Sequence, residues 1–117
     1  MNATDDETII TDDDMRGMLQ KSRPYTIMIL KKGASYDAPG SDKIIWEHGR
    51  RNFSLRADGR LAIVCPVSSD TVTGVGIFTS DIDETRAIMD EDPGVLAGVF
   101  VYETYSSRGF PGDALSV

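Results

Sequence analysis

The chain of 117 residues is 40% hydrophobic, which is enough for one compact domain and too little chain for two ordinary ones. Its formal charge of -7 argues against a nucleic-acid-binding surface. No run approaches the ~20 apolar residues of a membrane span, and the N-terminus is acidic where a signal peptide would be basic and then apolar. We therefore expect a cytoplasmic protein whose partners include neither a membrane nor a nucleic acid.

The acidic charge is concentrated near the N-terminus. Six acids precede the first base, Arg16, so that 13 of the 19 acids remain to balance 12 bases. The six are Asp5, Asp6, Glu7, Asp12, Asp13 and Asp14. The body of the chain is therefore about neutral, and residues 1–22 are predicted to form an acidic arm.

Within this arm, residues 1–10 are expected to be disordered or loosely docked. Thr11 has the position of an N-cap, and the three aspartates after it suit the dipole of a short helix. Met15, Met18 and Leu19 give that helix an apolar edge. We interpret the arm as a solvated appendage docked by this edge, with a regulatory or partner-binding role as the alternative.

The first strand is predicted at 25–30, because Pro24 interrupts the preceding structure and a continuous β-rich run follows it. Lys31 and Lys32 follow, ahead of a loop that reaches Gly40. The two lysines either end the strand in solvent, which we favour, or meet an anionic ligand.

A helix is predicted from about Asp42 to Arg56, with Ser41 as its N-cap. At 100° per residue its charged side chains share one arc, which leaves His48 and Asn52 one turn apart on the apolar half. Two polar groups on a buried arc need hydrogen-bond partners, since an unpaired buried group costs roughly 1 to 3 kcal/mol.

Two strands are predicted after this helix. The first covers 61–65 and ends where Pro66 cannot donate to a ladder. The second covers 74–79, and a polar connection that contains Ser68 joins the two. Cys65 is the only cysteine and cannot form an intramolecular disulfide; because it alternates with apolar neighbours, we interpret it as a small core residue rather than a nucleophile.

A second helix and a last strand follow. Asp81 and Glu84 resemble a capping box at the start of the helix, and Pro93 ends it directly after Asp92. The last strand is predicted at 99–105. Asp92 is thus expected between the end of a helix and the start of a strand, at an edge of the sheet where functional residues are common.

The predicted order after the arm is βαββαβ. This order is typical of the ferredoxin-like α+β sandwich, in which both helices cover one face of an antiparallel sheet. We assign it to residues 23–106, with 107–117 as a C-terminal tail. Because the other face of the sheet would be apolar and uncovered, we expect a homodimer that pairs through the sheet faces.

Three features of the sequence carry a resemblance to a known family. Residues 92–99 have the pattern Asp-Pro-x-Val-x-Ala-Gly-Val. A Gly-Arg-Leu turn at 59–61 enters the strand that Pro66 ends, and His48 lies upstream of that turn. Over about residues 25–105 the chain resembles the YCII-related (YciI-like) family of the dimeric α+β barrel superfamily.

The resemblance implies a ferredoxin-like protomer, a dimer and a pocket with a histidine and aspartate dyad, which falls on His48 and Asp92 here. Some relatives act on chlorinated aromatic rings, and the fold is similar to that of muconolactone isomerases. In this chain Gly94 stands where an aromatic residue is common, and Ile45 where an arginine is often found.

Together these observations predict a cofactor-free lyase or isomerase. His48 would move a proton, and Asp92 would orient the imidazole. Asn52 or Ser68 would position the substrate, a small aromatic or lactone-like acid. The alternative is a ligand-binding or interaction module with the same dimeric fold and no turnover. No residue spacing suggests metal ligands, and the glycines at 74 and 76 do not open a helix in a dinucleotide pattern.

Overall fold

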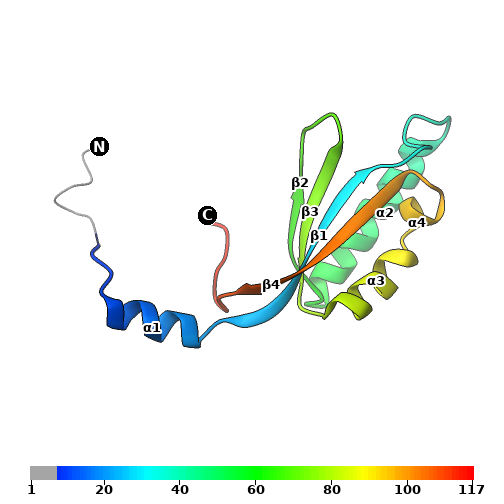
Figure 1. Ribbon diagram of the computed structural model, residues 1–117. Helices are drawn as coiled ribbons and strands as arrows, with labels where there is room; N and C mark the ends of the chain where they lie inside the picture. Colours follow the sequence, from blue (N-terminus) through cyan, green and yellow to red (C-terminus); the bar gives the residue numbers. More distant parts are fainter. Residues whose placement is uncertain (1–7) are drawn as a thin grey trace, which may run out of the picture. The chain divides into compact units, whose positions relative to one another are not determined.

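The computed structural model describes residues 8–117 and shows an α+β protein (Figure 1). Its elements, in chain order, are α1 (Asp12–Gln20), β1 (Arg23–Lys32), α2 (Ser41–Ala57), β2 (Leu61–Pro66), β3 (Val72–Phe78), α3 (Ile82–Asp90), α4 (Pro93–Leu96) and β4 (Phe100–Gly109). From β1 onward this is the predicted βαββαβ order with one short helix, α4, added. The last strand also runs further than predicted, into the residues expected to begin the tail.

Residues 24–108 form one compact unit, and the terminal segments lie outside it. In the N-terminal segment the predicted cap of α1 is confirmed, because Thr11 Oγ1 accepts from the N–H of Asp14 and Asp14 Oδ2 accepts from the N–H of Thr11, each at 3.1 Å. The hydrogen bond from the Thr11 backbone holds the pKa of the Asp14 carboxyl below its usual value. The apolar edge of α1 is about half exposed. The expectations for residues 1–7 fall outside the described residues.

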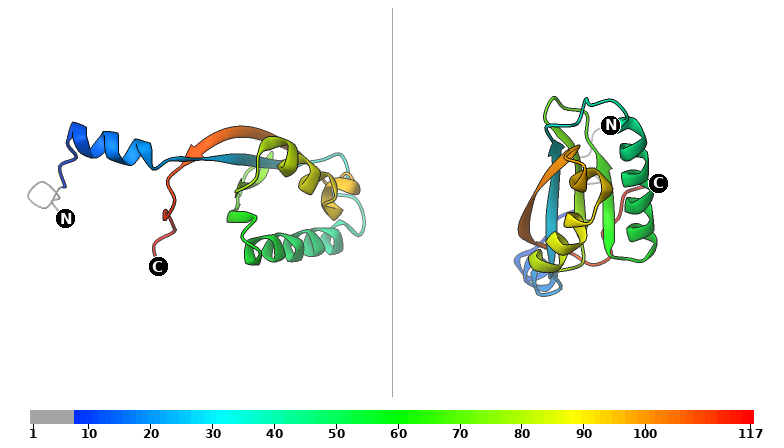
Figure 2. Two further views of the ribbon diagram at one scale, coloured as in Figure 1. Left: turned by 90° about the horizontal axis from the view of Figure 1, so that it is seen from below. Right: turned by 90° about the vertical axis from the view of Figure 1, so that its right-hand side faces the viewer.

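The four strands form one antiparallel sheet in the order β2-β3-β1-β4. This order is consistent with a ferredoxin-like sandwich. Figure 2 shows α2 and α3 on the same side of the sheet. On that side Met28 and Leu30 of β1 are buried, as are Leu61 of β2 and Phe78 of β3. Among the described residues the buried apolar core consists of Met28, Leu30, Leu55, Leu61, Phe78, Ile88, Met89, Val99 and Phe100.

A β-bulge near the start of β2 changes which of its residues share a face. Leu61 pairs with Phe78 of β3, whereas Ile63 already pairs with Ile77. Ile63 and Cys65 therefore lie on the face away from the helices, and Leu61 lies beneath them. Cys65, which the sequence favoured as a small core residue, is half-buried on that face.

Helix α2 begins differently from the prediction. Its N-cap is Gly40, which has φ 85° and makes no side-chain capping hydrogen bond, and Ser41 is the first residue of the helix. A glycine is favoured there because a left-handed backbone strains residues that carry a Cβ. Within residues 8–117 no helix has both the length and the apolar character needed to cross a bilayer.

Candidate functional site

Helix α2 buries two polar side chains. His48 and Asn52 are, with Leu55, its buried residues. As the helical spacing predicted, the two lie one turn apart, and Nε2 of His48 is 3.1 Å from Nδ2 of Asn52.

Asp92 is held by the short helix α4, which the sequence analysis missed. Asp92 is the N-cap, and its Oδ2 accepts from the backbone N–H groups of Gly94 at 2.9 Å and Val95 at 3.2 Å. Pro93 occupies the first helical position, where its missing N–H removes no helical hydrogen bond. The prediction that Pro93 only ends a helix is therefore corrected: α3 ends at Asp90, and Pro93 opens α4.

His48 and Asp92 are in direct contact across 44 residues of chain. Nδ1 of His48 lies 2.8 Å from Oδ1 of Asp92 and 2.9 Å from Oδ2. The exposed fractions are 6% for His48 and 0% for Asp92. The contact that was predicted between the two side chains is present, in a buried environment where an ion pair is weakly screened.

The partners of the imidazole indicate which nitrogen carries the proton. An ionised carboxylate only accepts hydrogen bonds, so Nδ1 of His48 donates to Asp92. In the neutral imidazole Nε2 is then the acceptor, and it takes an N–H of the Asn52 amide. The carbonyl oxygen of that amide, Oδ1, is buried and has no hydrogen-bond partner among the described residues. Asp92, His48 and Asn52 thus form a chain of hydrogen bonds that ends in a free acceptor.

Arg51 brings a positive charge to the same carboxylate. Its Nη1 is 3.9 Å from Oδ1 of Asp92, is buried, and makes no hydrogen bond within the described part of the chain. The helical wheel placed Arg51 on the polar arc of α2, so this contact was not predicted. At that distance the guanidinium contributes attraction rather than a directed hydrogen bond.

Phe100 closes one side of the site. Its ring centroid lies 4.6 Å from that of His48, with the planes tilted by 50°. A Cβ on Gly94 would come within 2.4 Å of Cδ2 of Phe100 and 3.0 Å of Oδ2 of Asp92. Gly94 therefore lets the first turn of α4 rest on the Phe100 ring while its N–H donates to the capping carboxylate of Asp92.

His48 and Asn52 line a pocket of about 670 Å³ between α2 and the sheet. Ser68, in the connection between β2 and β3, lines it as well, so three of the four predicted site residues border one pocket. Asp92 lies behind His48 and touches it without lining the pocket. A volume of this size is within the range of small-molecule sites.

Lys32 and Tyr36 also line this pocket. The sequence left contact with an anionic ligand as the less favoured alternative for Lys32 and indicated no role for Tyr36. The Nζ of Lys32 lies 4.9 Å from the centroid of the Tyr36 ring. Alternation along β1 could have separated Lys32 from Lys31, but only the fold shows which face borders the pocket.

The sequence matches no protein-family model and no curated protein. What is established is the α+β fold with its four-stranded antiparallel sheet. Across residues 8–117 no group of three or more His, Cys, Asp and Glu side chains is placed to hold a metal ion.

Proposed function

We propose that this protein is a small-molecule lyase or isomerase of the YCII-related kind, which works as a homodimer and uses His48 as a general acid and base. One observation carries the proposal: a buried imidazole that borders a pocket is held at 2.8 Å by a carboxylate. Asp92 fixes the tautomer and orientation of His48 and stabilises its charged form.

In this proposal Nε2 of His48 takes a proton from an acidic C–H or O–H of the substrate. In an isomerisation the imidazolium returns that proton to another atom of the same molecule. In an elimination the electron pair of the broken C–H bond forms a double bond, and the leaving group departs with its own bonding pair. In both reactions the hydrogen bond between Nε2 of His48 and the Asn52 amide must break before Nε2 can accept the proton.

Asn52 suits both protonation states of His48. With neutral imidazole its amide N–H donates to Nε2. When Nε2 carries a proton, a half-turn of the amide presents the unpartnered Oδ1 as an acceptor instead. Asn52 would therefore stabilise the imidazolium while the substrate is bound as an anion.

The test is turnover of small aromatic acids and lactones in D₂O, followed by NMR as loss of a C–H signal or appearance of product. We expect His48→Gln to lower the rate by about 100-fold or more, which is the usual contribution of a general acid or base. Glu47→Gln is the matched control, because Glu47 is exposed on the same helix and its ion pair within residues 8–117 is with Arg50. Equal rates in wild type and His48→Gln would overturn the proposal.

A binding module without turnover is the second candidate, and one observation favours it. Both ring nitrogens of His48 already have protein partners. On this alternative, ligands bind equally well to wild type and to Glu47→Gln, and no deuterium enters any of them. Incorporation of deuterium that depends on His48 would exclude it.

A further inference from the structure

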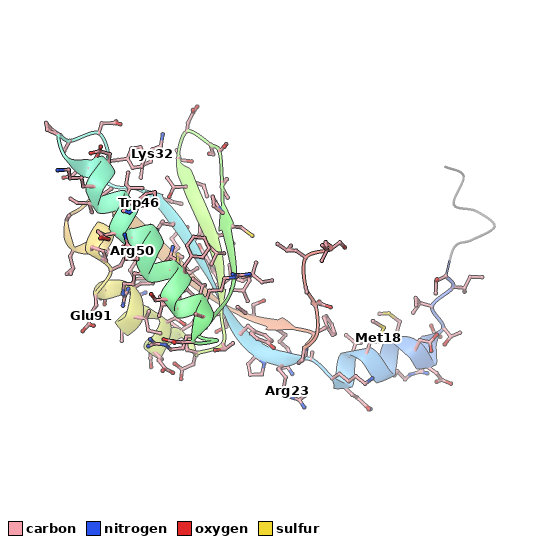
Figure 3. All side chains as sticks on the ribbon, turned by 180° about the vertical axis from the view of Figure 1, so that it is seen from behind. Met18, Arg23, Lys32, Trp46, Arg50 and Glu91 are labelled. Carbon is pink, nitrogen blue, oxygen red and sulfur yellow. The ribbon has the colours of Figure 1, made fainter. Side chains whose placement is uncertain are left out.

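Two consecutive lysines at the end of β1 point to opposite faces of the sheet. Nζ of Lys31 lies 3.1 Å from Oε1 of Glu103. Glu103 follows Tyr102, whose hydroxyl contacts α3, so Glu103 and Lys31 belong to the face without helices. Lys32 instead lines the pocket, and Figure 3 shows it beside the first turns of α2, on the side of the β2–β3 hairpin.

The ammonium of Lys32 brings a positive charge to the pocket. No carboxylate of residues 8–117 forms an ion pair with it, and it lies over the face of the Tyr36 ring. A cation held over an aromatic ring keeps its N–H donors free for an anion.

Asn52, another residue of the pocket lining, carries a buried polar group that needs a hydrogen-bond donor. Oδ1 of Asn52 accepts no hydrogen bond, and Asn52 is only 9% exposed. A buried carbonyl oxygen without a donor costs roughly 1 to 3 kcal/mol, so a ligand that supplies an O–H or N–H there gains that energy.

The wall around these two groups is mostly apolar. Met28, Leu30, Ile45, Leu61 and Val64 all contribute to it. Such a wall accepts a ring or a compact hydrocarbon body and rejects a sugar-like polyol.

We propose that the pocket binds a small organic monocarboxylate whose apolar ring fills the wall, whose carboxylate meets Lys32, and whose hydroxyl donates to Oδ1 of Asn52. A single lysine, with the carboxylate of Asp70 lining the same pocket, fits one negative charge better than the two of a phosphate monoester. The inference rests on the proposed function, since it names the substrate class of the same site.

The test is binding, measured by calorimetry and by amide chemical shifts, of meta- and para-hydroxybenzoate, the matching primary amides, and benzoate. Each comparison changes one group: the amides lack the negative charge, and benzoate lacks the hydroxyl. We expect a hydroxybenzoate to bind wild type about tenfold more tightly than its amide and about fivefold more tightly than benzoate.

Two substitutions on one strand provide the matched control. In Lys32→Gln the preference for acid over amide should disappear, whereas Lys31→Gln, which removes the same charge from the other face, should keep it. In Asn52→Ala the preference for hydroxybenzoate over benzoate should disappear while the preference for acid over amide remains. Both lysines are on the surface, so their variants keep the fold.

The inference is overturned if wild type binds acid and amide equally. It is also overturned if Lys31→Gln and Lys32→Gln lose the preference for acid over amide to the same degree, or if no probe binds at millimolar concentration. Tighter, Lys32-dependent binding of phenyl phosphate also overturns it. The proposed function fails separately. If the acids bind through Lys32 but no proton moves, the substrate site stands and catalysis is wrong. If neutral molecules are turned over through His48, catalysis stands and this inference is wrong.

Discussion

The carboxylate of Asp92 contacts both His48 on α2 and the N-terminus of α4. Oδ2 of Asp92 caps α4, and Oδ1 lies 2.8 Å from Nδ1 of His48 on α2. The carboxylate has no exposed surface, so these contacts replace the water that it loses on folding. The same side chain therefore positions the candidate catalytic imidazole and fixes the turn that follows α3.

Two substitutions of Asp92 separate these tasks. Asparagine is as good an N-cap as aspartate but has no charge for the imidazole, so Asp92→Asn should lower the free energy of unfolding by about 2 kcal/mol. Alanine loses the cap as well and leaves the buried His48 and the buried Nη1 of Arg51 without the carboxylate, so Asp92→Ala should cost about 3–5 kcal/mol. Urea denaturation followed by circular dichroism measures both.

The control for these variants is Asp83→Ala, in the exposed first turn of α3. It removes a charge near a helix N-terminus without breaking a buried contact, and about 0.5 kcal/mol is expected. The account of Asp92 fails if its alanine variant is no less stable than this control.

Gly94 is expected to tolerate no side chain. A Cβ there would overlap the buried Phe100 ring, so Gly94→Ala should destabilise the protein by about 1–3 kcal/mol. Gly49→Ala is the matched control, because nothing lies within 4 Å of its Cβ position in the middle of α2, and this variant should gain up to about 1 kcal/mol. Thermal unfolding of the two proteins distinguishes opposite shifts in Tm. A Gly94→Ala protein as stable as wild type would mean that α4 does not rest on Phe100.

Much of the site followed from local patterns. The 3.6-residue period of α2 put His48 and Asn52 on one buried face, and the order of strands and helices gave the antiparallel sheet. The pairing of His48 with Asp92 came from a family resemblance rather than from spacing, since no local pattern measures a distance across 44 residues.

The rest could not be read from the sequence for physical reasons. Four residues from Pro93 to Leu96 are too few to show a helical period, so Pro93 looked like a stop signal. The bulge in β2 shifts the face of Cys65 without any glycine or proline to mark it. The roles of Lys32, Arg51 and Phe100 depend on which elements pack together, because each contacts a residue on a different element or a pocket between elements.

Tyr102 should make the stability depend on pH in the alkaline range. Burial, and then its hydrogen bond to Asp90 and the charge of that carboxylate, raise the pKa of Tyr102 to about 12, while Arg86 acts in the opposite direction. Between the usual pKa of about 10 and this value, the native state keeps a proton that the unfolded chain loses. The contribution is therefore complete below about pH 10 and is lost as the pH rises toward 12.

The size of this effect should stay well below the ~1.4 kcal/mol per pKa unit of a buried group, because water screens the hydroxyl. Tyr102→Phe removes the titrating group. We expect the difference in unfolding free energy between wild type and Tyr102→Phe to narrow or reverse from pH 9 to pH 12, measured in urea. A constant difference across that range would contradict the raised pKa.

The sheet face that carries no helix is apolar across three strands. The register places Ile77 of β3 between Ile27 of β1 and Ile63 of β2, and places Val75 between Ile29 and Cys65. Two apolar rows therefore cross three strands on that face, and an apolar face of this kind usually marks a contact with another protein surface. A second copy is the simplest cover, because an isologous contact needs only one self-complementary patch.

We expect wild type to be a dimer at micromolar concentration and Ile77→Lys to be a monomer that keeps its fold, since a lysine at the centre of the row would bury a charge at the dimer contact. Light scattering gives the mass, and circular dichroism checks the fold. Ala87→Lys adds the same charge on the exposed side of α3 and should leave the dimer intact. A wild-type mass of one chain, or dissociation of the Ala87→Lys protein to the same degree, would show that the two apolar rows are not the dimer contact.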